Sequence, residues 1–250
     1  MNEKVHELLA ALRLKGMDQV LDEEIRRAEK EGVPAPEVLF RLLTEEQAYR
    51  QGQSLLYRLH VAKLPSDWTL KTFPFEKQPG VNRAQINALA GLDFLERGEN
   101  IVFVGNAGTG KSGLAIGIVR QALLSGYRGR FYNAQDLLDE LYASLADRSS
   151  AKLMKRLCRY DVLAIDEIGY LTLKPEQVNA FFKLMEERYS RKKSTILTTN
   201  LSYPEWYDLF QRKNLVDALL DRLNHHCITI HINGPSLRVP TRGKGKGDKP

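Results

Sequence analysis

GNAGTGKS, at residues 105–112, decides the fold of this chain, because it fits the spacing G-x-x-x-x-G-K-[ST] of a phosphate-binding loop. The residues before it, 101–104, form a short apolar segment typical of a buried parallel strand. The residues after it, 113–125, have apolar side chains at helical spacing. Strand, glycine-rich loop and helix in this order are the context that such a loop requires. The sequence therefore predicts an α/β protein with a phosphate site.

Each residue type in this loop has a physical role. Glycines allow backbone N–H groups to turn toward an anion, Lys111 can reach the terminal phosphates, and the Ser112 hydroxyl can bind Mg²⁺. A plain turn between strand and helix would not explain the lysine and serine, and neither would the shorter dinucleotide pattern G-x-G-x-x-G that residues 108–113 also satisfy. The predicted nucleotide-binding residues are Gly105, Asn106, Ala107, Gly108, Thr109, Gly110, Lys111, Ser112 and Gly113.

Composition indicates a globular protein and excludes several other classes. The chain has 250 residues, 43% of them hydrophobic, and a formal net charge of +6, which suits a polyanionic partner. Cys158 and Cys227 are the only cysteines, too few for a disulfide framework or a four-cysteine metal site. Because no signal core is present and no apolar run approaches the ~20 residues of a membrane span, a cytoplasmic location is expected.

The first part of the chain predicts a helical module over residues 1–66. Its apolar residues recur at three- and four-residue intervals, and the segment from Gly32 to Pro36 divides it into two or three helices, the last at about residues 36–59. That helix carries Arg41, Arg50 and Arg58, which either line a solvated face or contact DNA or a partner. We expect the module to bind DNA or a partner, or to support oligomerisation.

The main domain is predicted over residues 67–235, with alternating strands and helices. Strands are expected at 101–104, 130–133, 162–165, 195–199 and 228–232, with helices at 82–97, 134–145 and 175–190, which together indicate a parallel five-stranded sheet in a three-layer fold. Phe73 and Phe75 precede the first of these helices and could wall a nucleobase or cover the sheet. The basic residues 236–250 are expected to be disordered.

The third strand supplies what a hydrolytic site needs beyond the loop. It ends in Asp166 and Glu167, at the strand end where ligands of parallel sheets bind. Asp166 is predicted to hold Mg²⁺ together with Ser112, and Glu167 to orient and deprotonate the attacking water. Asn200, after the fourth strand, is either a turn residue or a sensor of the γ-phosphate. Arg222 either forms a surface ion pair or acts as an arginine finger on the nucleotide of a neighbouring subunit.

These motifs together carry a family resemblance. The loop, the segments DEIGYL at 166–171, TTN at 198–200 and LDRL at 220–223, and the stretches LRLKGM at 12–17 and AKLP at 62–65 resemble IstB-type transposition helper proteins, within the initiator and helicase-loader branch of AAA+ ATPases. The resemblance implies an ATP- and Mg²⁺-dependent ATPase that forms a ring or helical homo-oligomer on duplex DNA and stimulates a transposase of the same insertion sequence. It also implies catalytic roles for Lys111, Glu167, Asn200 and Arg222.

Two features leave alternatives open. Fewer than twenty residues follow the fifth strand, too few for the usual helical lid, so Arg238 either replaces the second sensor arginine or faces solvent. A basic run between the second and third strands is either a DNA-phosphate contact or a solvated helix face: Arg148, Lys152, Lys155, Arg156 and Arg159.

A replicative helicase loader of the DnaC type shares the whole ATPase core and is the rival function. A non-hydrolysing DNA-tethering protein is disfavoured by Asp166 and Glu167.

Overall fold

A computed structural model describes residues 2–169 and 171–238 of the chain. They form two compact units, one ending at His60 and the other beginning at Val61. The limits predicted for the helical module, 1–66, and for the main domain, 67–235, stay a prediction. Of the predicted disordered tail, residues 239–250 lie outside the described residues.

The first unit consists of three helices, α1 (Asn2–Ala11), α2 (Lys15–Glu31) and α3 (Ala35–Ala62). Four buried residues form its core: Leu9, Met17, Leu21 and Leu42. The carboxylate of Glu46 accepts hydrogen bonds from the backbone N–H groups of Gly16 (2.7 Å) and Met17 (3.3 Å), which satisfies free donors in the first turn of α2. Helix α2 ends at Gly32, whose φ of +65° is the left-handed conformation that favours glycine. The break predicted at residues 32–36 is confirmed.

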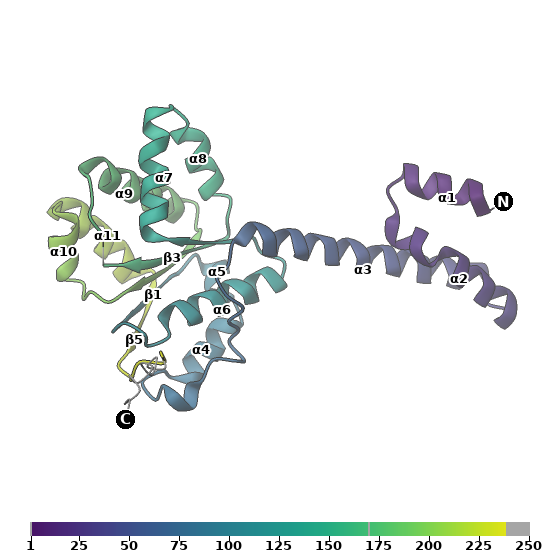
Figure 1. Ribbon diagram of the computed structural model, residues 1–250, viewed down its shortest axis with the longest axis horizontal. Coiled ribbons are helices and arrows are strands. Elements are labelled where there is room, and N and C mark those ends of the chain that lie inside the picture. Colours follow the sequence, from purple (N-terminus) through teal and green to yellow (C-terminus); the bar gives the residue numbers. More distant parts are fainter. Residues whose placement is uncertain (1, 170, 239–250) are drawn as a thin grey trace, which may run out of the picture. The chain divides into compact units, whose positions relative to one another are not determined.

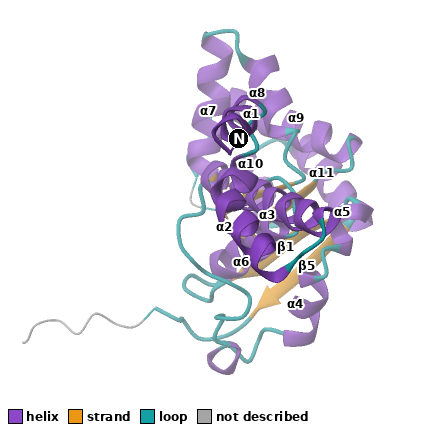
Figure 2. Cartoon of the chain, turned by 90° about the vertical axis from the view of Figure 1, so that its right-hand side faces the viewer, coloured by secondary structure: helices purple, strands orange, loops and turns teal. Residues whose placement is uncertain are grey.

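The second unit is built on a parallel sheet of five strands. In chain order these are β1 (Asn100–Gly105), β2 (Gly129–Asn133), β3 (Val162–Ile168), β4 (Ser194–Thr199) and β5 (Cys227–Ile232). Their order in space is β2-β3-β4-β1-β5, and β1 and β5 lie side by side (Figure 2). All five predicted strands are confirmed. Because every strand runs in the same direction, their carboxyl ends meet at one edge of the sheet.

Helices cover both faces of this sheet (Figure 1). Helix α6 (Lys111–Leu124) packs along β1 to β4 on one face, with α4 (Arg83–Ala90) against it. On the other face lie α7 (Ala134–Ala146), α9 (Pro175–Ser190) and α11 (Lys213–His225). The predicted three-layer α/β fold is therefore confirmed. None of the described helices is both long and apolar enough to cross a membrane.

Several helices differ from the sequence expectation. The helix predicted over residues 82–97 is two helices, α4 and α5 (Asp93–Arg97), because the chain turns at Gly91 and Leu92 and Leu92 adopts a left-handed φ of +68°. Helix α10 (Glu205–Phe210) and the short 3₁₀ helix η1 (Phe75–Lys77) were not predicted from the sequence, and α8 (Ser150–Leu157) was considered only as a helix face that carries the basic run. These elements are short, and short elements give weak periodic signals.

A buried arginine joins three parts of the domain. Arg188, on α9, is fully buried and donates hydrogen bonds to the carbonyl oxygens of Leu157, Tyr160 and Ser194 and to the Thr195 hydroxyl. Burial lowers the pKa of its guanidinium to about 10. The side chain thus satisfies carbonyl groups at the end of α8, in the following loop and at the start of β4.

Candidate nucleotide-binding site

The predicted phosphate loop connects β1 to α6, as expected. Gly108 and Gly110 adopt φ angles of +79° and +96°, which side chains with a Cβ rarely tolerate. Helix α6 then begins at Lys111, so its free backbone N–H groups face the loop. The loop and the positive end of the helix therefore form a site suited to an anion.

Lys111 lies inside the loop that precedes it. Its Nζ donates hydrogen bonds to the carbonyl oxygens of Gly105 (2.7 Å) and Asn106 (2.8 Å). Burial lowers the pKa of this ammonium, and the nearby carboxylates of Asp166 and Glu167 act in the opposite direction. The cation therefore lies between the loop and the two acids at the end of β3.

Asp166 and Ser112 meet at the start of α6. The Ser112 hydroxyl donates to Asp166 Oδ1 at 2.8 Å, and the hydroxyl of Thr198 donates to the same oxygen. Asp166 is 8% exposed, and burial raises its pKa although both hydroxyls act in the opposite direction. These oxygen ligands fit Mg²⁺, which in nucleotide sites takes one or two carboxylates, a hydroxyl, waters and phosphate oxygens. No cluster of three His, Cys, Asp or Glu residues suited to a metal occurs among the residues that the structure describes.

Glu167 is exposed at the same edge of the sheet, next to Asp166. The pairing of β3 with β4 shifts register between Ile165 and Ile168, and Glu167 adopts a left-handed φ of +65°. Such a bulge redirects side chains at a strand end. The conformation is held by two hydrogen bonds, from Glu167 N–H to Thr198 Oγ1 (2.9 Å) and from Asn133 Nδ2 to Glu167 Oε2 (3.0 Å).

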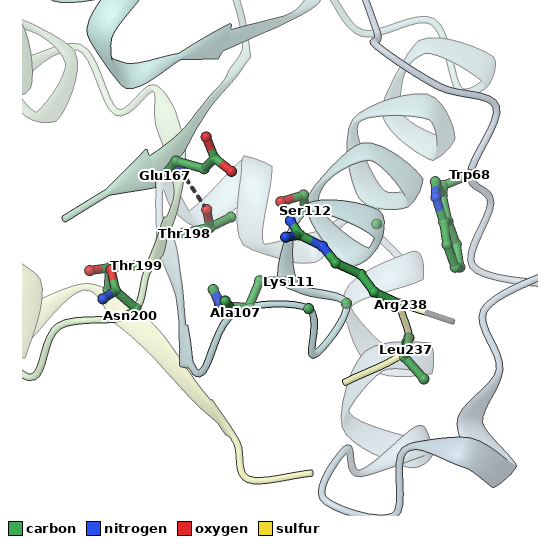
Figure 3. Close-up of a pocket in the computed structure, with 13 residues that line it drawn as sticks. Trp68, Ala107, Lys111, Ser112, Glu167, Thr198, Thr199, Asn200, Leu237 and Arg238 are labelled. Atoms are coloured by element: carbon green, nitrogen blue, oxygen red, sulfur yellow. Dashed lines mark hydrogen bonds between the residues drawn. The ribbon is translucent and has the colours of Figure 1, made fainter. Parts of the chain in front are cut away.

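Asn200 follows β4 and lies against the chain that leaves β3. A Cβ on Gly169 would lie 2.2 Å from Asn200 Oδ1, so only glycine allows this approach. Figure 3 shows Asn200 and Glu167 on the same side of the loop. The structure thus brings the loop, both acids and Asn200 together.

The loop, Glu167 and Asn200 line one cavity of about 270 Å³, and Asp166 accepts a hydrogen bond from Ser112 of that lining. Its wall also includes three residues from outside the sheet edge, namely Trp68, Leu237 and Arg238 (Figure 3). The full lining is Trp68, Ala107, Gly108, Gly110, Lys111, Ser112, Gly113, Glu167, Thr198, Thr199, Asn200, Leu237 and Arg238.

The segment after β5 runs over the phosphate loop. The backbone N–H of Leu237 donates to the carbonyl of Gly108 at 2.7 Å, and Ser236 packs on the same glycine. Beneath the loop, the buried amide of Gln78 donates to the carbonyls of Thr109 and Pro235, both at 2.9 Å. Residues 233–238 form no helix and instead close one side of the cavity, where Arg238 lowers the pKa of Lys111 by charge repulsion.

Other predicted site residues lie elsewhere. Arg222, on α11, is not part of the cavity lining of its own chain. Its guanidinium pairs with Glu186 at 3.3 Å and lies over the Tyr189 ring at 5.9 Å. On and beside α8, the five predicted basic residues are exposed, and Arg156 pairs with Glu140. Phe73 is buried, and neither Phe73 nor Phe75 lines the cavity.

Sequence reasoning missed three residues of this site. Thr198 stands in the quoted TTN segment but was not assigned a role, and Asn133 was assigned only to a strand. Trp68 was placed in the main domain without a role. A polar residue at the end of a parallel strand is the signal that could have found Thr198 and Asn133. Trp68 has no such signal, because its place depends on how residues 66–70 cross α6.

Comparison with known proteins places this geometry in a family. The model of the family described as IstB-like ATP binding protein matches residues 7–245. The chain belongs to this family. An ATP-binding protein of insertion sequence IS5376 from Geobacillus stearothermophilus is 36% identical over 239 residues, covering 96% of this chain and 95% of the relative. The corresponding protein of insertion sequence IS21 from Pseudomonas aeruginosa is 35% identical, covering 95% of this chain and 89% of the relative.

Solved structures share the fold of the second unit of this IstB-like protein. The crystal structure of the DnaC helicase loader superposes with a TM-score of 0.56 and 26% identity, covering 66% of this chain and 96% of that chain. The replication initiator DnaA bound to AMPPCP and single-stranded DNA matches with a TM-score of 0.55 and 20% identity, over 68% of this chain and 51% of that one, a likeness of fold. The second unit of this IstB-like protein therefore has the AAA+ fold of the initiator and helicase-loader branch.

Proposed function

We propose that this IstB-like protein is an Mg²⁺-dependent ATPase that assembles on duplex DNA and stimulates a partner transposase. One observation carries the proposal: the phosphate loop and Glu167 line a single cavity, and Asp166 accepts a hydrogen bond from Ser112 of the same lining. A site that only bound nucleotide would need Asp166 for the metal, but it would not need the exposed carboxylate of Glu167 beside it. Relatives at 36% and 35% identity belong to insertion sequences, which supports transposition as the process served.

The residues would divide the work as follows. Backbone N–H groups of the loop and Lys111 would hold the phosphates, and Ser112 and Asp166 would hold Mg²⁺. The metal, when bound, neutralises charge that develops on the phosphates. Glu167 would take the proton from the attacking water, and Asn200 would contact the γ-phosphate or that water. Thr198 would fix both acids by its two hydrogen bonds.

Assembly is proposed to complete the site. Arg222 lies outside the cavity of its own chain, on a helix that also carries exposed residues. In an oligomer it would reach the nucleotide of a neighbouring subunit as an arginine finger. The exposed basic side chains on and beside α8 are the proposed contacts with DNA phosphates. The protein would then work in the cytoplasm, at the nucleoid.

A helicase loader is the second candidate function. The likeness to DnaC at 26% identity favours it, because the loader shares the ATPase core. The two functions differ in their nucleic acid: a transposition ATPase should assemble on duplex DNA, whereas we expect a loader to prefer single strands. Gel-shift assays with both kinds of DNA, each with ATP and with ADP, separate them.

The central test is Lys111→Ala in an assay of ATP-dependent assembly on duplex DNA. Removing the ammonium should weaken ATP binding by about 10- to 150-fold, the effect of losing a charged hydrogen bond worth ~1.5–3 kcal/mol. Assembly at ATP concentrations near the wild-type Kd should then be lost. Lys183→Ala is the matched control, since it removes the same charge from an exposed site on α9 outside the cavity. Unchanged assembly by Lys111→Ala would contradict the proposed site.

A further inference from the structure

Trp68 is the aromatic residue among the described residues that line the cavity. Its ring is half-buried and packs on Phe73, with ring centroids 6.0 Å apart. Phe73 in turn lies under Gly110, where a Cβ would be 2.7 Å from the Phe73 ring. The aromatic layer thus reaches from beneath the phosphate loop to the cavity, and Trp68 is the member that lines the cavity.

The position of Trp68 is fixed by α6. Two glycines one turn apart, Gly113 and Gly117, leave the surface of α6 flat where residues 66–70 cross it. A Cβ at Gly113 would lie 3.1 Å from the Trp68 ring, and one at Gly117 would lie 2.8 Å from Leu70. Arg120, one turn further along, donates to the carbonyls of Ser66 (3.0 Å) and Trp68 (3.2 Å). A segment outside any helix or strand is therefore anchored at several points, which holds the indole in place.

The cavity has a polar end and an apolar end. Figure 3 shows Trp68 and Glu167 on opposite sides of Ser112, and the Arg238 side chain directed toward Ser112. A triphosphate bound by the loop with its terminal phosphate toward Glu167 would direct its nucleoside away from the acids. The wall in that direction contains Trp68 and Leu237.

We propose that Trp68 stacks on the base of the bound nucleoside triphosphate, opposite Leu237, and selects purines over pyrimidines by ring area. This inference rests on the proposed function, since it requires that the loop bind a triphosphate. Stacking does not depend on the groups at the edge of the base, and every base has a π-face. Apart from Arg238, whose side chain is directed toward Ser112, the polar side chains of the lining belong to the loop and the strand ends. ATP and GTP should therefore bind with similar affinity, and CTP and UTP more weakly.

Fluorescence tests the contact directly, because Trp68 and Trp206 are the only tryptophans. Trp206 is fully buried in α10, so its emission should not respond to a ligand in the cavity. In wild-type protein, ATP and GTP should quench the tryptophan emission, and inorganic triphosphate, which has no base, should not. Trp68→Phe protein retains Trp206 alone and should show no quenching by either nucleotide. Quenching of equal size in Trp68→Phe would overturn the proposal.

Affinity gives the second readout. Trp68→Ala should weaken ATP binding by about 5- to 150-fold, the equivalent of ~1–3 kcal/mol for one stacked base, and leave binding of inorganic triphosphate unchanged. Trp68→Phe should recover most of the affinity, whereas Trp68→Leu, which still packs on Gly113, should not. Phe75→Leu is the matched control, an aromatic of the same segment that does not line the cavity.

The outcomes separate this inference from the proposed function. If wild-type protein binds ATP and Lys111→Ala does not, but Trp68→Ala binds ATP normally, the stacking proposal is wrong and the ATPase proposal stands. If wild-type protein binds neither ATP nor inorganic triphosphate, both proposals fall. Equal loss of ATP and of triphosphate binding in Trp68→Ala would show a merely structural role and would also overturn the stacking proposal.

Discussion

At the scale of single residues, Thr198 connects the two acids of the site, Asp166 and Glu167, by hydrogen bonds. Its hydroxyl accepts from the Glu167 backbone and donates to the Asp166 carboxylate, so one buried side chain sets the direction of both acids. The sequence predicts the two acids from their place at a strand end. It does not predict Thr198, because that role depends on the register of β4 against β3 across more than thirty residues.

Glu167→Gln tests the proposed base. The substitution keeps the size of the side chain and an oxygen that can accept from Asn133, so the loop and ATP binding should be unaffected. Turnover should fall by about 10²- to 10⁴-fold, the usual contribution of a general base. Steady-state phosphate release and equilibrium ATP binding, measured on the same preparation, provide the two readouts. Hydrolysis near the wild-type rate would place the base elsewhere.

At the scale of elements, strands and helices differ in how well the sequence predicts them. Strands β1, β3 and β4 are mostly buried and β2 and β5 partly so, and their β-branched and aromatic residues predict all five to within one residue at their starts. The helix at 82–97 fails because Leu92 turns left-handed, a conformation that the apolar spacing does not signal. The sequence also does not predict the position of residues 66–70. That position depends on Gly113 and Gly117 of α6, which look like ordinary helix positions in the sequence.

A contact with a titratable side chain joins α1 to α2, and it predicts that the stability of the protein depends on pH. His6, on α1, contacts Asp18 (2.6 Å) and Asp22 (3.3 Å) on α2. Hydrogen bonds to Asp18 and Asp22 raise the pKa of the imidazole above its usual value of about 6.5. A raised pKa means that the stabilising contribution is complete below about pH 6.5 and is lost as the pH rises through the folded-state pKa.

The difference in melting temperature between wild type and His6→Gln should therefore shrink as the pH rises above about 6.5. Thermal melts of the full chain at several pH values measure this difference, and the titration of the His6 ring by NMR reports its pKa directly. Lys4→Gln, on the same helix, serves as a control with no such contact among those described. A difference that does not change with pH would show that the His6 contact is not ionic.

At the scale of the whole molecule, one chain contributes most of the proposed hydrolytic site, and the proposed arginine finger lies outside it. The loop, both acids and Asn200 come together within one chain, whereas Arg222 lies on α11 outside that cavity. An ATPase built in this way would be coupled to assembly, since hydrolysis would need a neighbour in the correct position.

Mixing experiments test this coupling. Arg222→Ala and Glu167→Gln proteins should each be nearly inactive, because an arginine finger contributes up to about 10³- to 10⁵-fold in rate. A mixture should regain activity, since an intact Glu167 in one subunit can then meet Arg222 of the other. Glu186→Gln, which removes the ion-pair partner of Arg222, should keep normal activity. No recovery at any mixing ratio would indicate that Arg222 acts within its own chain or only in packing.

The segment after β5 adds a consequence for how the protein is made. Residues 233–238 are translated after the sheet, the loop and both acids, yet Leu237 and Arg238 form part of the cavity wall. A chain released by the ribosome directly after Ile232 would retain every strand and lack this wall. If this cavity binds the nucleotide as proposed, we expect a chain that ends there to bind it more weakly than the full chain.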